Sequence, residues 1–166
     1  MYAGHFAAGL AIKVAEPRAP MAALMGLVFL PDLLWLGFSV GGIEVVERGQ
    51  WFDGWSHSIA SIVLQATLAA MLWWRQGVGV AVAVSCAVLS HLILDLPIHP
   101  APLEWYPHAA TGFGNFLGKA NGWWVEAAIV VGGVSIYLAG SRRAGVDKAA
   151  ASAAAILVAW LHVAFG

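Results

Sequence analysis

Long apolar runs alternate with short polar segments along almost the whole chain, a pattern typical of a bundle of membrane helices. The run at 2–14 would extend only ~20 Å as a helix, less than the ~30 Å of a hydrocarbon layer, so we expect a short or partly inserted helix. The sequence therefore predicts an all-α, polytopic membrane protein that forms a single domain over residues 1–166. The predicted membrane segments are 2–14, 21–40, 55–74, 78–96, 123–139 and 149–165, with a long outer loop between the fourth and fifth.

The composition supports the same class of protein. Hydrophobic residues make up 61% of the 166 residues and charged residues only 10%, whereas an ordinary soluble domain is about a quarter charged. The net charge of −1 provides no basic surface, so we expect no nucleic-acid partner. The single cysteine, Cys86, excludes an internal disulfide. The first residues lack the basic region of a cleaved signal peptide, so we expect none.

Lysine and arginine are unevenly divided between the two sets of alternate loops. Positive residues are enriched on the cytoplasmic side of membrane proteins, so the richer set is expected inside and both termini outside. The inner set is Lys13, Arg18, Arg75, Arg142, Arg143 and Lys148, and the outer set is Arg48 and Lys119.

The stretch from Ser90 to His99 places ionisable side chains at the end of an apolar helix. His91 and Asp95 are four residues apart, so they project from one helical face. Pro97 should end the helix, and His99 follows in the loop. An ionisable pair inside an apolar span is costly to bury without partners, and it therefore indicates a functional site.

In this topology all six histidines fall on the outer side. Imidazoles and carboxylates converging from several helices are ligands for Zn²⁺, Fe or Mn, and zinc is the usual ion for hydrolysis. Ser56 and Ser58 flank His57 and could fix its tautomer. As ligands of one ion, the imidazoles of His57 and His91 should approach within about 4 Å. An activated water could then attack an ester or a phosphoester. The expected metal ligands are His5, Asp32, His57, His91 and Asp95.

Each of these polar residues also has an ordinary structural interpretation. Asp32 follows Pro31 and could cap a broken helix. Glu126 could pair with Lys119 or Arg48 at the surface. Histidines at a membrane interface often only form hydrogen bonds, which applies to His99, His108 and His162. The acidic residues of the polar loop are expected to be solvated, namely Glu44, Glu47 and Asp53.

Several short motifs occur in a fixed order: Gly4-His5, Pro31-Asp32, Ser56-His57-Ser58, Ser90 to Asp95, Asp95 to His99 (Asp-x-Pro-x-His), and Tyr106-Pro107. In these motifs the chain resembles the predicted membrane-bound metal-dependent hydrolases, bacterial inner-membrane proteins of mostly unknown substrate. The resemblance runs from His5 to about Glu126. It implies a location in the bacterial inner membrane, and it implies that the five expected ligands are metal-binding or catalytic.

The chain departs from that family at two positions. Leu34 stands where the family often has a second acid, and Phe52-Asp53-Gly54 stands where it often has His-Arg-Gly. One carboxylate and one histidine are therefore missing. This leaves a single metal, two metals or a site that has lost its metal all open.

Three functional hypotheses follow. The leading one is a hydrolase that acts on a lipid-linked or phosphoester substrate at the outer face, with Asp32, Glu126 or His99 as general acid or base. The second is a non-catalytic membrane subunit that binds a pigment, a lipid, a partner protein or further copies of itself. The third is a proton or metal-ion transporter, but the inner halves of the segments have almost none of the polar groups that a path requires.

Overall fold

The computed structural model describes residues 2–47, 50–99 and 101–165, and for residues 47, 50, 51 and 118–120 it describes the backbone only. Helices make up most of this part of the chain, as the apolar pattern predicts. They are α1 (Tyr2–Ala15), α2 (Met21–Leu27), α3 (Leu30–Val40), α4 (Gly54–His57), α5 (Ile59–Trp73), α6 (Val78–Asp95), α7 (Gly118–Gly140) and α8 (Lys148–Phe165), with a 3₁₀ turn at Trp74–Gln76. Two short antiparallel hairpins were not predicted, and they pair β1 (Val46–Glu47) with β2 (Gln50–Trp51) and β3 (Leu103–Glu104) with β4 (Gly112–Phe113).

Each of the six predicted segments contains a helix, but two segments are broken. The 21–40 segment divides into α2 and α3, which are bent by 56° at the break. Pro31 occupies the first turn of α3, where its missing N–H is tolerated. The 55–74 segment divides at Ser58, which has extended backbone and whose hydroxyl caps α5 by accepting from the Ser61 amide.

Three described helices, α6, α7 and α8, are long and apolar enough to cross a membrane, and the bent pair α2–α3 makes a fourth if it counts as one span. Helices α1 and α5 have 14 and 15 residues and would extend only ~21 and ~22 Å. A mostly helical protein with helices long and apolar enough to span a membrane is thus confirmed, whereas the predicted number of six spans stays a prediction.

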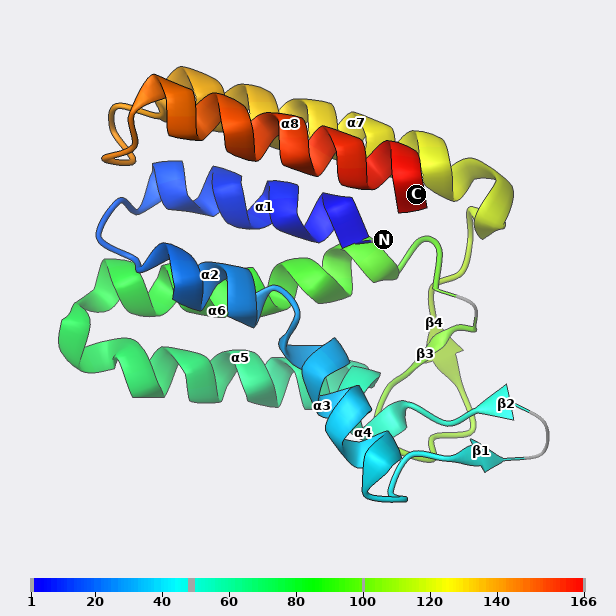
Figure 1. Cartoon of the computed structure of the whole chain (residues 1–166). Coiled ribbons are helices and arrows are strands. Elements are labelled where there is room, and N and C mark those ends of the chain that lie inside the picture. The colour runs from blue at the N-terminus through cyan, green and yellow to red at the C-terminus, as the bar shows by residue number, and fades with distance from the viewer. Residues whose placement is uncertain (1, 48–49, 100, 166) are drawn as a thin grey trace.

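Helix α1 lies inside the bundle, where one face of it is buried. Figure 1 shows it between the α7–α8 pair and α6. Its small residues allow this position: a Cβ added to Gly133 of α7 would lie 2.6 Å from the Ala7 carbonyl oxygen, so the two backbones touch. One apolar core joins α1, α7 and α8, and a second joins α2, α5 and α6.

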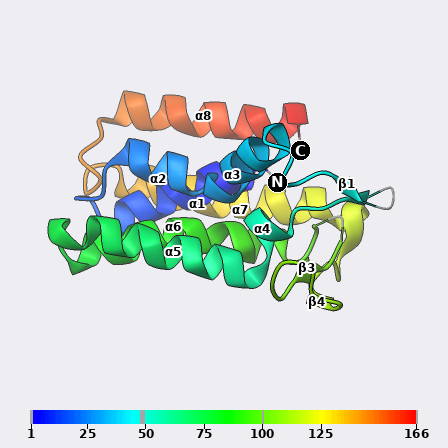
Figure 2. The same ribbon diagram turned by 90° about the horizontal axis from the view of Figure 1, so that it is seen from below.

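The two ends of the bundle differ. Both termini and both hairpins lie at one end, and the turns that join α1 to α2, α5 to α6 and α7 to α8 lie at the other (Figure 1), a division also visible from below in Figure 2. The latter turns carry or adjoin the six basic residues that the sequence groups together. The fold therefore places one set of loops at each end, as the orientation argument requires, and the membrane side of each end stays a prediction.

Candidate metal centre

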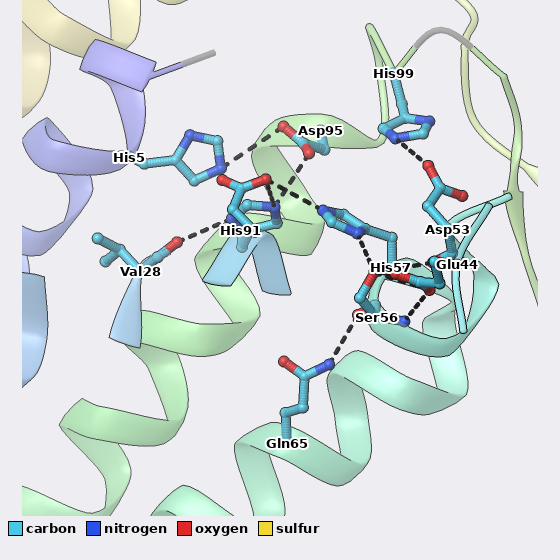
Figure 3. Close-up of polar contacts among 11 residues, drawn as sticks. His5, Val28, Glu44, Asp53, Ser56, His57, Gln65, His91, Asp95 and His99 are labelled. Carbon is cyan, nitrogen blue, oxygen red and sulfur yellow. Dashed lines mark hydrogen bonds and ion pairs between the residues drawn. The ribbon is translucent and has the colours of Figure 1, made fainter. Parts of the chain in front are cut away.

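The site begins with the last two turns of α6, at the end of the bundle that holds the termini. Helix α6 ends at Asp95, two residues before Pro97, as predicted. His91 is fully buried, and its Nε2 lies 3.2 Å from Oδ2 of Asp95. The i, i+4 pair that the sequence suggests is therefore formed inside the protein (Figure 3).

The break between α2 and α3 fixes the tautomer of His91. The Val28 carbonyl at this break lies 2.9 Å from Nδ1 of His91. A carbonyl oxygen can only accept, so Nδ1 carries the proton and donates it. In the neutral ring Nε2 is then a bare lone pair, and this buried nitrogen has no hydrogen-bond donor among the described residues.

Asp32 and His57 approach the same nitrogen from α3 and α4. Oδ1 of Asp32 lies 3.4 Å from Nε2 of His57 and 3.9 Å from Nε2 of His91. The ligand atoms of Asp32, His57 and His91 all lie within 4.8 Å of one another, a limit wider than the about 4 Å expected for ligands of one ion. The side chain of Asp32 is 37% exposed, so this is the open side of the cluster.

The buried carboxylate of Glu44 orients His57 through the Ser56 hydroxyl. The Ser56 hydroxyl lies 2.7 Å from Nδ1 of His57 and 2.8 Å from Oε2 of Glu44, and the Ser56 amide also donates to Glu44. Because an ionised carboxylate only accepts, the hydroxyl donates to Glu44 and accepts from Nδ1 of His57. Nε2 of His57 is left as a lone pair facing Asp32. This chain of contacts is drawn in Figure 3.

Two sequence predictions about this support were wrong and one was right. Glu44 is not solvated but has no exposed surface, because it folds beneath Ser56. Ser58 bonds to Ser61 rather than to the imidazole of His57. Ser56 holds that ring as expected. No spacing rule links Glu44 to His57, since the intervening loop sets their separation.

His5 completes the cluster from the first turn of α1. Its Nε2 lies 3.6 Å from Oδ1 of Asp95, and its ring centroid lies 4.3 Å from that of His91. His5, His91 and Asp95 offer ligand atoms within 4.8 Å of one another, as Asp32, His57 and His91 do. All five predicted ligands therefore lie around the single available nitrogen of His91.

The spacing of these ligand atoms suits a bound cation. Nitrogen–oxygen hydrogen bonds are about 2.7–3.2 Å long, and ligands held at ~2.1 Å by a tetrahedral ion lie ~3.4 Å apart. The four nitrogen–oxygen separations in the cluster run from 3.2 to 3.9 Å. With two lone pairs directed at carboxylates, the donor set fits a divalent transition metal.

His99 stands beside this cluster and pairs with Asp53. Its Nε2 lies 3.3 Å from Oδ2 of Asp53, Nδ1 donates to the Ala101 carbonyl, and its ring centroid lies 5.9 Å from that of His57. Burial disfavours the charged ring, but the hydrogen bond to Asp53 and the Ala101 carbonyl outweigh it and raise the pKa of His99 above its ordinary value. Asp53, expected to be a solvated charge, is thus part of a pair.

Glu126 and His162 form a separate cluster. Oε1 of Glu126 accepts from the amide of Gly4 at the start of α1, and Oε2 lies 3.2 Å from Nδ1 of His162 on α8. Both side chains are buried, so Glu126 does not pair with a basic residue at the surface. The two partners suggested from the sequence, Arg48 and the side chain of Lys119, lie outside the described part of the chain. Neither Glu126 nor His162 belongs to the described metal-ligand groups.

His108 also lies apart from the metal ligands. Its ring stacks on Phe52 with a centroid separation of 4.2 Å, and its amide donates to Glu104. The ordinary structural interpretation applies to this histidine.

Comparison with known proteins adds no further assignment: no family model, no curated protein and no solved structure matches the chain significantly.

Proposed function

We propose that the protein is a metal-dependent hydrolase of the membrane, which cleaves an ester or phosphoester bond in a lipid or lipid-linked substrate. The observation that carries the proposal is the environment of Nε2 of His91. This nitrogen is buried, its lone pair is set by the Val28 carbonyl, and two carboxylates face it. A lone pair surrounded by anions is unfavourable, and either a proton on Nε2 or a metal ion between these groups would relieve it. We favour the metal ion, because two carboxylates and the Nε2 of His57 gather at the same place.

The residues that would hold the ion are His5, Asp32, His57, His91 and Asp95. Bound there, a divalent ion such as zinc would supply Lewis acidity for polarising the scissile group and activating water. Both candidate ligand groups contain His91, and Nδ1 of this ring is already bonded to the Val28 carbonyl. Only Nε2 is available to both groups, which favours a single ion. The absence of a second acid at Leu34 agrees with a single ion.

The remaining residues have supporting roles in this proposal. The Val28 carbonyl orients His91, and the Glu44–Ser56 pair orients His57, so neither ring needs to reorganise to present Nε2. Asp32 lies on the open side and is suited to accept a proton from an attacking water. His99, charged more readily because of Asp53, is suited to donate a proton to a leaving group.

The location of the site supports a lipid substrate. The cluster lies where α6 ends and where the loops and termini gather, which for a membrane helix is the level of the lipid head groups. The positive-inside rule assigns this end to the outer side. The resemblance of the motifs to the membrane-bound metal-dependent hydrolases adds the bacterial inner membrane to the proposal.

The proposal can be tested by hydrolysis in reconstituted vesicles. The purified protein would be stripped with a chelator, reloaded with Zn²⁺ or Mn²⁺, and offered phospholipids and prenyl phosphates while released head group and phosphate are measured. We expect metal-dependent turnover that falls at least about 100-fold in Asp95→Asn, because this removes one ligand charge. His108→Gln, a histidine outside the cluster, is the matched control and should retain activity. Equal turnover with and without metal, or in Asp95→Asn, would contradict the proposal.

A further inference from the structure

An apolar groove is formed by α3, α4 and α5, and two of these helices, α3 and α4, also carry ligands of the candidate metal centre. It has a volume of about 430 Å³, within the usual range for a ligand-binding pocket. It follows α5 from Ala60 to Leu68, a length of ~12 Å. Its walls include Leu34 and Phe38 of α3, Trp55 of α4, and Leu64, Gln65 and Leu68 of α5.

The groove opens onto a surface suited to hydrocarbon. Leu64 and Leu68 on its edge are 58% and 49% exposed, and the apolar surface continues along α5 to Met71 and Leu72. In a membrane-embedded helix such side chains face lipid tails. The molecule available to enter the groove from this side is therefore a lipid chain.

Gln65, which lines the groove, has a polar atom that points to a ligand with a hydrogen-bond donor. Gln65 is buried, and its Nε2 donates to the Ser56 carbonyl at 2.8 Å. Its Oε1 is buried and has no hydrogen-bond partner in the part of the chain that is described. Figure 3 shows the amide reaching toward Ser56 with this oxygen turned aside. A buried acceptor without a donor is costly, so a ligand hydroxyl would satisfy it.

The groove and the metal centre share two structural walls. Helix α3 carries both Asp32 of the cluster and Leu34 of the groove, and Trp55 of the groove is two residues before His57. Gln65 contacts Ser56, the residue that holds the ring of His57. A lipid chain in the groove would therefore contact the same two helices that carry Asp32 and His57.

We infer that this groove binds one hydrocarbon chain of a hydroxyl-bearing lipid, and that Oε1 of Gln65 accepts a hydrogen bond from the hydroxyl. That this lipid is the substrate rests on the proposed function. The binding itself does not, because it requires only the groove and the membrane.

Photo-crosslinking in lipid nanodiscs tests the inference. The probe is phosphatidylglycerol with a diazirine on one acyl chain, and the labelled residues are mapped by mass spectrometry. We expect labelling of Phe38, Leu64 and Leu68 at least fivefold above that of Val131 and Ile156, which are exposed on α7 and α8. Uniform labelling of all these residues would mean ordinary surrounding lipid and would overturn the inference.

Two variants on the same helix sharpen the result. Leu64→Trp should fill the groove and lower the labelling of Phe38 and Leu68 at least fivefold. Leu72→Trp, at a 74% exposed position outside the groove, should leave it unchanged. An equal effect of both variants would contradict a specific groove, and the wild-type labelling pattern decides the matter if Leu64→Trp fails to fold.

The hydroxyl and the metal can be tested separately. A matching diazirine probe of phosphatidylcholine, which has no hydroxyl, serves as the control lipid. Gln65→Leu should lower groove labelling by the phosphatidylglycerol probe at least threefold and leave labelling by the phosphatidylcholine probe unchanged. An equal loss with both probes would contradict the role of Oε1. Asp95→Asn should keep the labelling while it loses hydrolysis. If the wild type labels the groove but shows no metal-dependent hydrolysis, the proposed function fails alone. If it hydrolyses lipid without groove labelling, this inference fails alone.

Discussion

Two buried histidine–carboxylate clusters lie at the same end of this bundle, and they differ in which ring nitrogen faces the acid. In the pair of His162 and Glu126, Nδ1 of the histidine faces the carboxylate, so a neutral ring can donate its one proton there. Glu126 has a second donor in the Gly4 amide. This pair needs no cation and serves to join α1, α7 and α8.

In the cluster around His91 the proton of the neutral His91 ring is not donated to a carboxylate. Nδ1 donates to the Val28 carbonyl, and Nε2 meets Asp32 and Asp95 as a lone pair. The same arrangement recurs at His57, whose proton goes to Ser56. The same residue types therefore give a structural link in one place and a candidate metal site in the other, because the hydrogen-bond partner of each ring sets its tautomer.

The largest difference between the two clusters should appear in metal content. His91→Ala removes the nitrogen common to both ligand groups, and we expect it to reduce bound metal from about one ion per chain to near zero. His162→Ala removes another buried histidine and should leave the metal content intact. Elemental analysis of the purified proteins measures both, and equal metal content in the two variants would remove the distinction.

Stability should depend on the pair of Glu126 and His162, although metal content does not. Glu126→Ala leaves His162 and the start of α1 without their buried partner, and we expect a loss of about 3 kcal/mol of unfolding free energy. Metal bound per folded chain should stay the same. Unfolding in mild detergent, followed by circular dichroism, gives the first quantity. A stable Glu126→Ala protein that has lost its metal would place Glu126 in the metal centre after all.

A smaller effect is expected from the support of His57. Glu44→Gln keeps the size of the side chain but removes the charge that orients the Ser56 hydroxyl, and we expect zinc affinity to fall roughly 10–100-fold. Competition with a chromophoric chelator measures the affinity. Glu104→Gln is the matched control, since Glu104 contacts the His108 amide outside the cluster. Unchanged affinity in Glu44→Gln would show that His57 needs no such support.

The smallest effect is the pH dependence of the pair formed by His99 and Asp53. The pKa of His99 is raised in the folded protein, so the pair stabilises the fold below the unfolded pKa of about 6.5, and this stabilisation is lost as pH rises through the folded pKa. We expect the unfolding free energy of the wild type to exceed that of Asp53→Asn by up to about 1 kcal/mol at pH 6, and this difference to be smaller at pH 9. Thermal unfolding at the two pH values measures the difference, and a gap that widens with pH would contradict the pairing.

The sequence predicts the clustering of the five candidate ligands, whereas their binding of a metal stays a prediction. Four-residue spacing puts His91 and Asp95 on one face, and the alternation of spans brings His5, Asp32 and His57 to the same end of the bundle. The contacts that could not be predicted from the sequence depend on the paths of loops and on which helices are neighbours. The burial of Glu44 depends on the path of the 41–53 loop, and the pairing of Glu126 with His162 depends on α7 and α8 packing together.

Helix breaks were only partly predictable. Pro31 signals the division of α2 from α3, since proline removes a backbone donor. The break at Ser58 has a weaker signal: serine is favoured at an N-cap over a helix interior, but a single serine in an apolar run does not fix a helix start without its partner Ser61. The breaks matter for the site, because one frees the Val28 carbonyl for His91 and the other positions His57 at the end of α4.

The central claim is that the imidazoles around His91 bind a metal ion through Nε2. X-ray absorption spectroscopy at the zinc edge of the reconstituted protein tests it most directly. We predict four to five nitrogen or oxygen ligands at about 2.0–2.2 Å, with the multiple scattering of at least two imidazoles, which His91→Ala abolishes and His162→Ala does not. A zinc ion with no imidazole ligand, or a spectrum unchanged in His91→Ala, would contradict the account.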